Sequence, residues 1–350
     1  MNKTIKRNFL LFLMIVATFI LLFFKYKNIE KPQSDYFKQL KVNFIEGDRT
    51  TVFDLNTDNH FFSVGYEKGI IEFYNIKNNK KKTVKAHELR VSHISSSKNE
   101  NIVASSSYFE KETKLWNPAT GDQIASLPET YGPEKFYLNS NNLVLAAGKK
   151  LKIFDTYNKK FYKEEYQCSQ NIHSLAISRK GGYIAAGTTN GVCLWNVDIL
   201  KDNSSYLDKI RNRYKILLSS AGEEIISDSK NWVQSLAFTD DDKKLFAILR
   251  NGKLHSWQLG FLDSHKITST KLRWVRDSII TDNLKIIIGT EDKRGRGIGR
   301  IEYLSDDELS SKIIPQKIRT FAPIILINNN QYLLVGASKE FWLIPVIDYF

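Results

Sequence analysis

Acid–base or metal chemistry would need histidines, carboxylates or cysteines at fixed spacings. The 350-residue sequence has six histidines, but no HExxH pair and no G-x-S-x-G turn. The histidines are scattered along the chain, at His60, His87, His93, His173, His255 and His265. The sequence therefore predicts no catalytic, metal-binding or cofactor-binding residues.

The two cysteines, Cys168 and Cys193, are too far apart in the chain for a CxxC redox or metal motif. Two cysteines also cannot make the multiple cross-links of a small secreted domain. We interpret them as structural residues, and a single disulfide between them is the open alternative.

Two polar stretches contain side chains suited to binding rather than to reaction. SYFEKET carries two aromatic residues, and EDKRGRGIGR interleaves arginine with glycine but lacks the GK[ST] ending of a phosphate-binding loop. Arginine and aromatic residues are enriched where protein interfaces carry most of their energy. Five residues are therefore candidates for binding a partner, with a plain hairpin tip as the alternative: Tyr108, Phe109, Arg294, Arg296 and Arg300.

The elements that position these loops form a repeat. Each unit has an alternating strand, a polar turn, an apolar strand ending in small residues, and a third strand ending in an aromatic residue. Most spacings between these aromatics lie near 40 residues, a period typical of stacked or circular repeats. The seven aligned aromatics are Tyr74, Trp116, Phe154, Trp195, Trp257, Tyr303 and Trp342.

The repeat resembles a WD40-repeat β-propeller of seven blades. Trp116-Asn117 and Trp195-Asn196 stand where that family has Trp-Asp, and Phe154-Asp155 keeps only the acid. AHELRVSHI, with His87, matches the family's Gly-His segment, and the other units lack this histidine. The resemblance implies that His87 and the aligned aromatics are structural, and that the family's His–Ser/Thr–Asp–Trp network is incomplete here.

The resemblance also assigns loops to faces. Loops between the second and third strands, and between successive units, lie on one face, the top; the other loops lie on the bottom. Residues 40–47 would close the ring by completing the last blade. The insertion at about 198–231 reads as a helix, because Leu207, Ile210, Tyr214 and Leu217 share one helical face.

Basic residues then gather on the bottom, where they could face anionic lipid, with solvated loop charges as the alternative. This prediction places Lys80, Lys81 and Lys82 in a loop between third and fourth strands. The candidate membrane-facing residues are Lys80, Lys81, Lys82, Lys209, Arg211 and Arg213.

The N-terminus predicts a membrane anchor. Residues 9–24 contain no charge, lie between a short basic tail (1–8) and a linker (25–39), and precede no small-residue cleavage site. The propeller then covers 40–350. We expect the N-terminus inside and the propeller on the non-cytosolic side, with a cleaved signal and the opposite orientation as alternatives.

A net charge of +13 indicates an acidic partner or surface. With a propeller, an anchor and no catalytic motif, the sequence favours a membrane-anchored, non-catalytic scaffold for protein–protein interaction. The alternative is a secreted or periplasmic propeller that is an enzyme or binds a cofactor. Nucleic-acid binding rests on charge alone and does not explain an anchor.

Overall fold

In the computed structural model the chain divides into two compact units, Met1–Val42 and Asn43–Phe350. The predicted basic tail, membrane helix and linker all lie outside the described residues. Within the described part, no helix is both long and apolar enough to cross a membrane. The described residues are 45, 48–56, 60–137, 141–162, 166–196, 213–217, 232–239, 241–259, 261–269, 275–280, 286–290, 300–305, 308–313, 324–327, 332–336 and 341–345.

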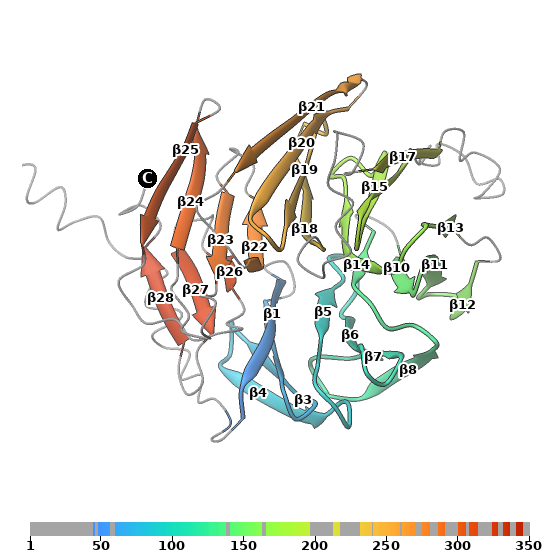
Figure 1. Cartoon of the computed structure of the whole chain (residues 1–350). Helices are drawn as coiled ribbons and strands as arrows, with labels where there is room; N and C mark the ends of the chain where they lie inside the picture. Colours follow the sequence, from blue (N-terminus) through green and yellow to red (C-terminus); the bar gives the residue numbers. More distant parts are fainter. Residues whose placement is uncertain are drawn as a thin grey trace, which may run out of the picture. The chain divides into compact units, whose positions relative to one another are not determined.

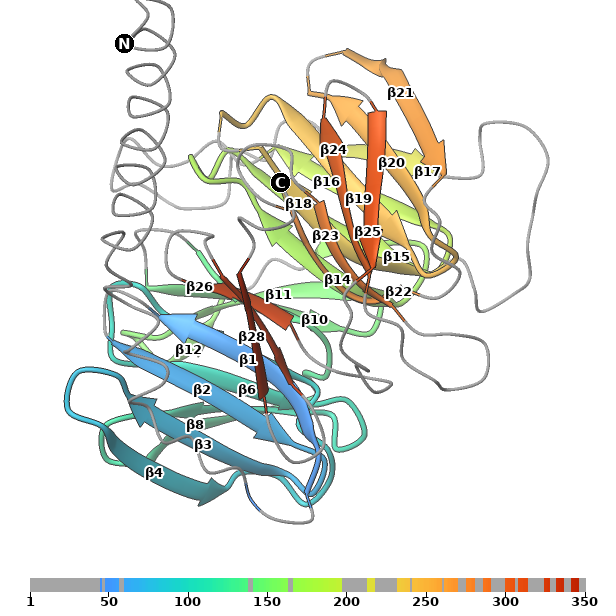
Figure 2. The same ribbon diagram turned by 90° about the vertical axis from the view of Figure 1, so that its left-hand side faces the viewer.

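The described elements of the second unit are antiparallel sheets whose strands follow chain order, except that β13 pairs with β11. The first sheet consists of β1 (Thr50–Asn56), β2 (Phe61–Tyr66), β3 (Ile70–Asn75) and β4 (Lys80–Lys85), seen side by side in Figure 2. The second consists of β5 (His93–Ser96), β6 (Val103–Ser107), β7 (Glu112–Trp116) and β8 (Gln123–Pro128). The third consists of β9 (Glu134–Phe136), β10 (Asn142–Ala147), β11 (Lys150–Asp155), β12 (Lys160–Phe161) and β13 (Tyr166–Gln167).

The same order continues through the rest of the chain. The fourth sheet consists of β14 (Ile172–Ile177), β15 (Tyr183–Thr188), β16 (Gly191–Asn196) and β17 (Arg213–Leu217). The fifth consists of β18 (Val233–Phe238), β19 (Lys244–Leu249), β20 (Lys253–Gln258) and β21 (Phe261–Ser269). The remaining strands are the pairs β22 (Val275–Ile280) with β23 (Ile286–Thr290) and β24 (Arg300–Ser305) with β25 (Glu308–Ile313), and the triplet β26 (Ile324–Ile327), β27 (Tyr332–Gly336) and β28 (Phe341–Pro345).

The first strands of successive sheets contact one another in a closed circuit. β1 contacts β5, β5 contacts β9, and the series runs on through β14, β18, β22 and β26 (Figure 1). β26 returns to β1, so residues far apart in sequence meet where the circuit closes. β23 also contacts β24, which places β22–β25 in one succession. This arrangement presents the top loops of different sheets on one face.

The aligned aromatics fill the space between neighbouring sheets. Four of them share a core cluster with residues of the preceding sheet, because a single repeat unit cannot bury its own faces. The pairings are Trp116 with Phe73, Phe154 with Leu115, Trp195 with Ile153, and Trp257 with Leu194. Tyr74 is also buried, and its hydroxyl donates to Glu72 over 2.6 Å. For Tyr303 in β24 and Trp342 in β28, the side chains lie outside the described part.

The polar residue that follows the aromatic closes the turn to the fourth strand. Asn117 Oδ1 accepts hydrogen bonds from the N–H groups of Ala119 (2.9 Å) and Thr120 (3.4 Å). Asn75 and Asp155 do the same in the first and third sheets. A side-chain oxygen is all that this turn needs, so Asn serves as well as Asp.

These turns end on a residue with positive φ. That residue is Asn79 (φ 55°) in the first sheet, Gly121 (83°) in the second and Lys159 (52°) in the third. Only glycine adopts this region without a steric cost. The turn in the second sheet therefore has the residue that fits, and the turn in the third sheet does not.

The predicted helix in the insertion is wrong for residues 213–217. Arg213–Leu217 forms β17, which pairs with β16 from Trp195↔Arg213 to Gly191↔Leu217. Short apolar runs do not distinguish a helix from a strand by spacing alone, and the unpaired edge of β16 decides the outcome. The parts of the insertion on either side of β17 lie outside the described residues.

The prediction that Lys80, Lys81 and Lys82 lie in a bottom loop is also wrong. They are the first residues of β4, paired with β3. Lys81 donates to the buried carboxylate of Glu72 over 2.7 Å, so it is held in an internal ion pair. Lysines on an outer strand also protect the sheet edge from pairing with another chain.

We predict that Lys159→Gly stabilises the protein, because the substitution removes the cost of a left-handed lysine. The free energy of unfolding should rise by about 0.5–1 kcal/mol in urea denaturation of the full-length protein in neutral detergent. Gly121→Ala is the matched control: an added Cβ would lie 3.1 Å from Val84 Cγ1 at a φ of 83°, so stability should fall. A loss of stability in Lys159→Gly would contradict this account of the turn.

Candidate functional site

The top loops bring together three aromatic side chains, which we call the top-loop aromatic cluster: Tyr108, Phe109 and Tyr131. The ring centres of Tyr108 and Phe109 are 5.8 Å apart, and those of Tyr108 and Tyr131 are 5.9 Å apart, both edge to face. Phe109 is 66% exposed and Tyr108 40% exposed. Leu89, from the loop between the first two sheets, is exposed on the same face. Exposed apolar groups gathered in this way are typical of a binding surface.

Tyr108 and Phe109 are candidates from the sequence, whereas Tyr131 is not. Tyr131 comes from the loop between the second and third sheets, which carries no repeat signal. The turn at Gly148 leaves room for it, because a Cβ on Gly148 would lie 2.8 Å from the Tyr131 hydroxyl. Lys111 lies beside the same ring, with its Nζ 5.8 Å from the ring centre.

A buried hydrogen-bond chain supports the loop that carries this cluster. Trp116 Nε1 donates to Ser105 Oγ (2.9 Å), which lies 2.9 Å from His87 Nε2. His87 Nδ1 lies 3.2 Å from Glu110 Oε2, and Glu110 Oε1 accepts from Leu89 N–H at 2.5 Å. Burial lowers the pKa of His87, so the neutral ring accepts from Ser105 and donates to Glu110.

The sequence predicts that the family's His–Ser/Thr–Asp–Trp network is incomplete, because the other units lack this histidine. In the second sheet it is complete, with a glutamate in place of the family's aspartate. Sequence analysis missed Glu110 because it lies in the turn after β6, inside a stretch interpreted as a partner-binding loop. His87, Glu110 and Glu112 offer ligand atoms within 4.8 Å of one another. Both nitrogens of His87 are already engaged in the chain, so we assign these residues a structural role.

A second polar cluster joins the first strands β5 and β9 to β6, the second strand of the second sheet. Ser106 Oγ is 2.7 Å from Glu134 Oε2, 3.0 Å from the Gly132 carbonyl oxygen and 3.4 Å from His93 Nδ1. A hydroxyl carries one hydrogen. If Ser106 donates it to Gly132, the bond to Glu134 requires a protonated carboxyl as the donor.

The electrostatics of this cluster agree with a neutral Glu134. Burial raises the pKa of Glu134 to about 8 and lowers that of His93 to about 3. Burial also raises the pKa of Asp54 on β1, whose carboxylate accepts from Ser96. The positive charge of Lys135 opposes these shifts in Asp54 and Glu134 and adds to the shift in His93. Spacing could not reveal the cluster, because its members come from separate strands.

Two histidines of the fifth sheet form a pair. His255 Nδ1 is 2.9 Å from His265 Nε2, and the ring of Trp257 stacks on His265 with centres 4.9 Å apart. Burial lowers the pKa of His255 to about 4, and burial also lowers that of His265. Both rings are therefore neutral at pH 7, and one hydrogen bridges the two nitrogens. The pair fixes β21 against β20.

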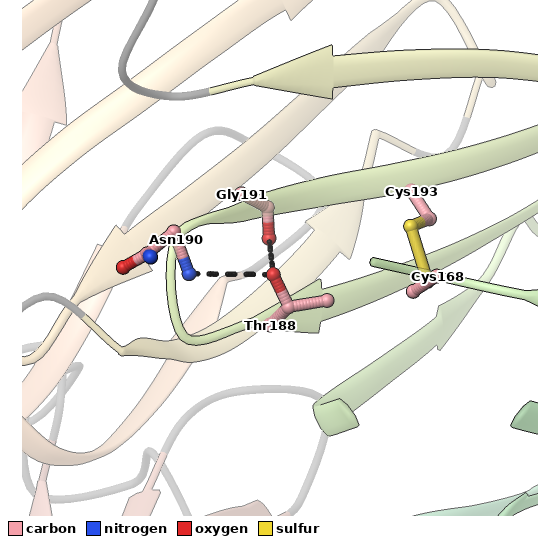
Figure 3. The surroundings of a disulfide bond; sticks show 5 residues. All are labelled: Cys168, Thr188, Asn190, Gly191 and Cys193. Carbon is pink, nitrogen blue, oxygen red and sulfur yellow. Dashed lines mark hydrogen bonds between the residues drawn. A yellow bond between two sulfur atoms is a disulfide. The ribbon is translucent and has the colours of Figure 1, made fainter. Parts of the chain in front are cut away.

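Cys168 and Cys193 form a disulfide, the alternative that the sequence left open (Figure 3). Their Cα atoms are 6.1 Å apart, and the bond joins the end of the third sheet to β16 of the fourth. The nearby β15–β16 turn is closed by Thr188 Oγ1, which donates to the Gly191 carbonyl over 3.0 Å and accepts from Asn190 N–H over 3.3 Å. This end of the fourth sheet is therefore cross-linked as well as hydrogen-bonded.

Several other predicted residues lie outside the described part, or their side chains do. Arg300 begins β24 and Arg213 begins β17, but neither side chain is described. The residues outside altogether are Arg294, Arg296, Lys209 and Arg211. The arginine-rich loop and the basic insertion therefore stay predictions.

We predict that Glu134→Gln removes a pH dependence of stability. Unfolded glutamate loses its proton near 4.5, whereas folded Glu134 keeps it to about 8. The wild type should lose stability between these values, because the unfolded state then binds fewer protons. In urea denaturation, the free energy of unfolding of Glu134→Gln minus that of the wild type should increase between pH 4.5 and about pH 8. Above that range the difference should stay constant.

The matched control for this prediction is Glu129→Gln, at an exposed position in the loop that leads to β9. It should follow the wild type at every pH. Parallel curves for Glu134→Gln and the wild type would show that Glu134 is ionised in the folded protein.

No protein-family model and no characterised protein sequence matches the chain. Among solved structures, it is similar to the structure of U3-55K, with a TM-score of 0.66 and 11% identity over 87% of this chain and 98% of that one. It is also similar to the crystal structure of the RRP9 WD40 repeats, with a TM-score of 0.65 and 10% identity over 87% and 96% of the two chains. At such identities the likeness concerns the fold alone. The chain has the WD40-type β-propeller fold that its repeat implied.

Proposed function

We propose that this WD40-type propeller is a non-catalytic scaffold for protein–protein interaction and that it binds a partner through the top-loop aromatic cluster. The observation that carries the proposal is the exposure of Phe109 and Tyr108 beside Tyr131. Burying such rings under a partner would remove a large apolar area from water. A β-propeller also presents its loops on a rigid support, which favours recognition.

The alternative function, an enzyme, would use the cluster of His93, Ser106 and Glu134. Ser106 is fully buried, and Glu134 is 1% exposed. A substrate could not reach either group without disrupting the inner strands. The burial of Ser106 and Glu134 therefore supports a structural role for these two residues, and with it the scaffold.

We further infer a ring of seven blades, one for each aligned aromatic, closed by residues 40–47 on the last sheet. Two observations support this count: the first strands contact one another in a closed circuit, and β26–β28 lack a fourth strand among the described elements. A closed ring leaves only short sheet edges exposed.

We also propose that residues 9–24 anchor the chain in a membrane and that the propeller lies on the non-cytosolic side. The disulfide supports this side, because disulfides persist in oxidising compartments and are rare in the cytosol. The basic residues that begin β4 and β17, and those of the insertion, are the candidates for contact with anionic lipid.

Site-specific photo-crosslinking tests the scaffold. A photoreactive amino acid at position 109 should capture a protein in cells, whereas the same group at position 157 should not. Tyr157 is the matched control, because it is 77% exposed and lies in the β11–β12 turn on the opposite face. Equal products from both positions, or none from position 109, would count against the proposal.

Thiol labelling tests the compartment. Protein taken from cells under denaturing, non-reducing conditions should react with a maleimide–polyethylene glycol only after reduction, because its two cysteines are paired. Cys168→Ser is the control, since Cys193 then lacks its partner and should react at once. Labelling of both wild-type cysteines without reduction would favour a cytosolic propeller.

A further inference from the structure

The top-loop aromatic cluster is flanked by lysines without an acidic partner. Lys111 is exposed, and its Nζ lies 5.8 Å from the centre of the Tyr131 ring. Lys149, also exposed, directly follows Gly148, whose backbone packs against the Tyr131 hydroxyl. Neither lysine has an ion pair with a carboxylate of the described residues. Two positive charges are therefore available beside an apolar surface.

The acids of the same top loops are mostly engaged in other bonds. Glu67 pairs with Arg49 at 2.6 Å, and Glu110 is held by His87 and the Leu89 N–H. Glu88 lies 3.6 Å from Lys85. An exposed acid does lie nearby, Glu129, which precedes Tyr131 in the same loop. With that exception, the unpaired charge next to the cluster is positive.

The loop that presents these groups is preorganised. The N–H of Lys111 donates to the Ser107 carbonyl over 3.2 Å, and Lys111 has a φ of 56°. The Tyr108 N–H donates to Ser92 Oγ over 3.1 Å, and Glu110 joins the buried chain to Trp116. A loop fixed at three places loses little entropy on binding, so exposed groups on it recognise a partner at low cost.

We propose that the top-loop aromatic cluster binds a partner segment that combines an apolar side chain with neighbouring carboxylates. The apolar side chain packs against Phe109 and Tyr108, and the carboxylates lie beside Lys111 and Lys149. This inference rests on the proposed scaffold function and specifies the chemistry of its partner. Charge complementarity at the rim of an apolar contact sets specificity and association rate.

The test measures peptide binding to the full-length protein in neutral detergent by fluorescence anisotropy. The probes are a peptide that alternates Phe with Asp and Glu, and a matched peptide in which every acid is Lys. The acidic peptide should bind the wild type more tightly. The double variant Lys111→Glu and Lys149→Glu should weaken its binding about tenfold and remove the preference over the lysine peptide. Phe109→Ala should weaken binding of either peptide.

The matched control carries Tyr157→Ala with Lys159→Glu in the β11–β12 turn, and it should bind as the wild type does. Equal binding of both peptides, or an unchanged affinity of the double lysine variant, would overturn this inference. If Phe109→Ala still weakened binding in that case, the scaffold would stand with a partner of other chemistry. Failure of the acidic peptide to bind would also overturn the inference. So would a result in which anionic vesicles, and not the peptide, bind the protein in a way that depends on Lys111 and Lys149. The photo-crosslinking at position 109 would then test the proposed scaffold function independently of the peptide experiment.

Discussion

Within the described part of the chain, the fold depends on aromatic side chains that are buried between one sheet and the sheet before it. An aromatic side chain buries about 150–250 Å², which corresponds to about 4–6 kcal/mol of transfer free energy at 25 cal/mol per Å². Trp116, Phe154, Trp195 and Trp257 are each 5% exposed or less. Because each lies in a core cluster that its own sheet shares with the preceding sheet, no sheet is stable alone, and the first strands must meet in a circuit.

This constraint explains why the repeat tolerates loss of its diagnostic dipeptide. The aromatic residue is needed for burial, and the residue after it is needed only to accept N–H groups in the following turn. Asn75, Asn117 and Asp155 all meet that need with one side-chain oxygen. Family sequence models weigh residue identity, so a chain that keeps the physical roles and changes the residues matches none of them while keeping the fold.

The same distinction sets what the sequence could predict. Strands ending in Trp116 or Trp195 follow from periodicity, because burial repeats with the unit. The strand Arg213–Leu217 does not, since its apolar spacing fits a helix equally well and the unpaired edge of β16 decides its conformation. Part of the candidate site could be predicted from the sequence, because Tyr108 and Phe109 are adjacent in one loop. The contributions of Tyr131, Glu110 and the Ser106–Glu134 contact could not, because they depend on loops and strands that only the fold brings together.

The buried network of the second sheet also connects the fold to its surface. The chain from Trp116 through Ser105 and His87 ends at Glu110, which lies between the exposed Phe109 and Lys111. The aromatic that holds two sheets together thus fixes the loop that a partner would contact. The proposed binding at the top-loop aromatic cluster would therefore use rigidity that the propeller needs for its own stability, at little additional conformational cost.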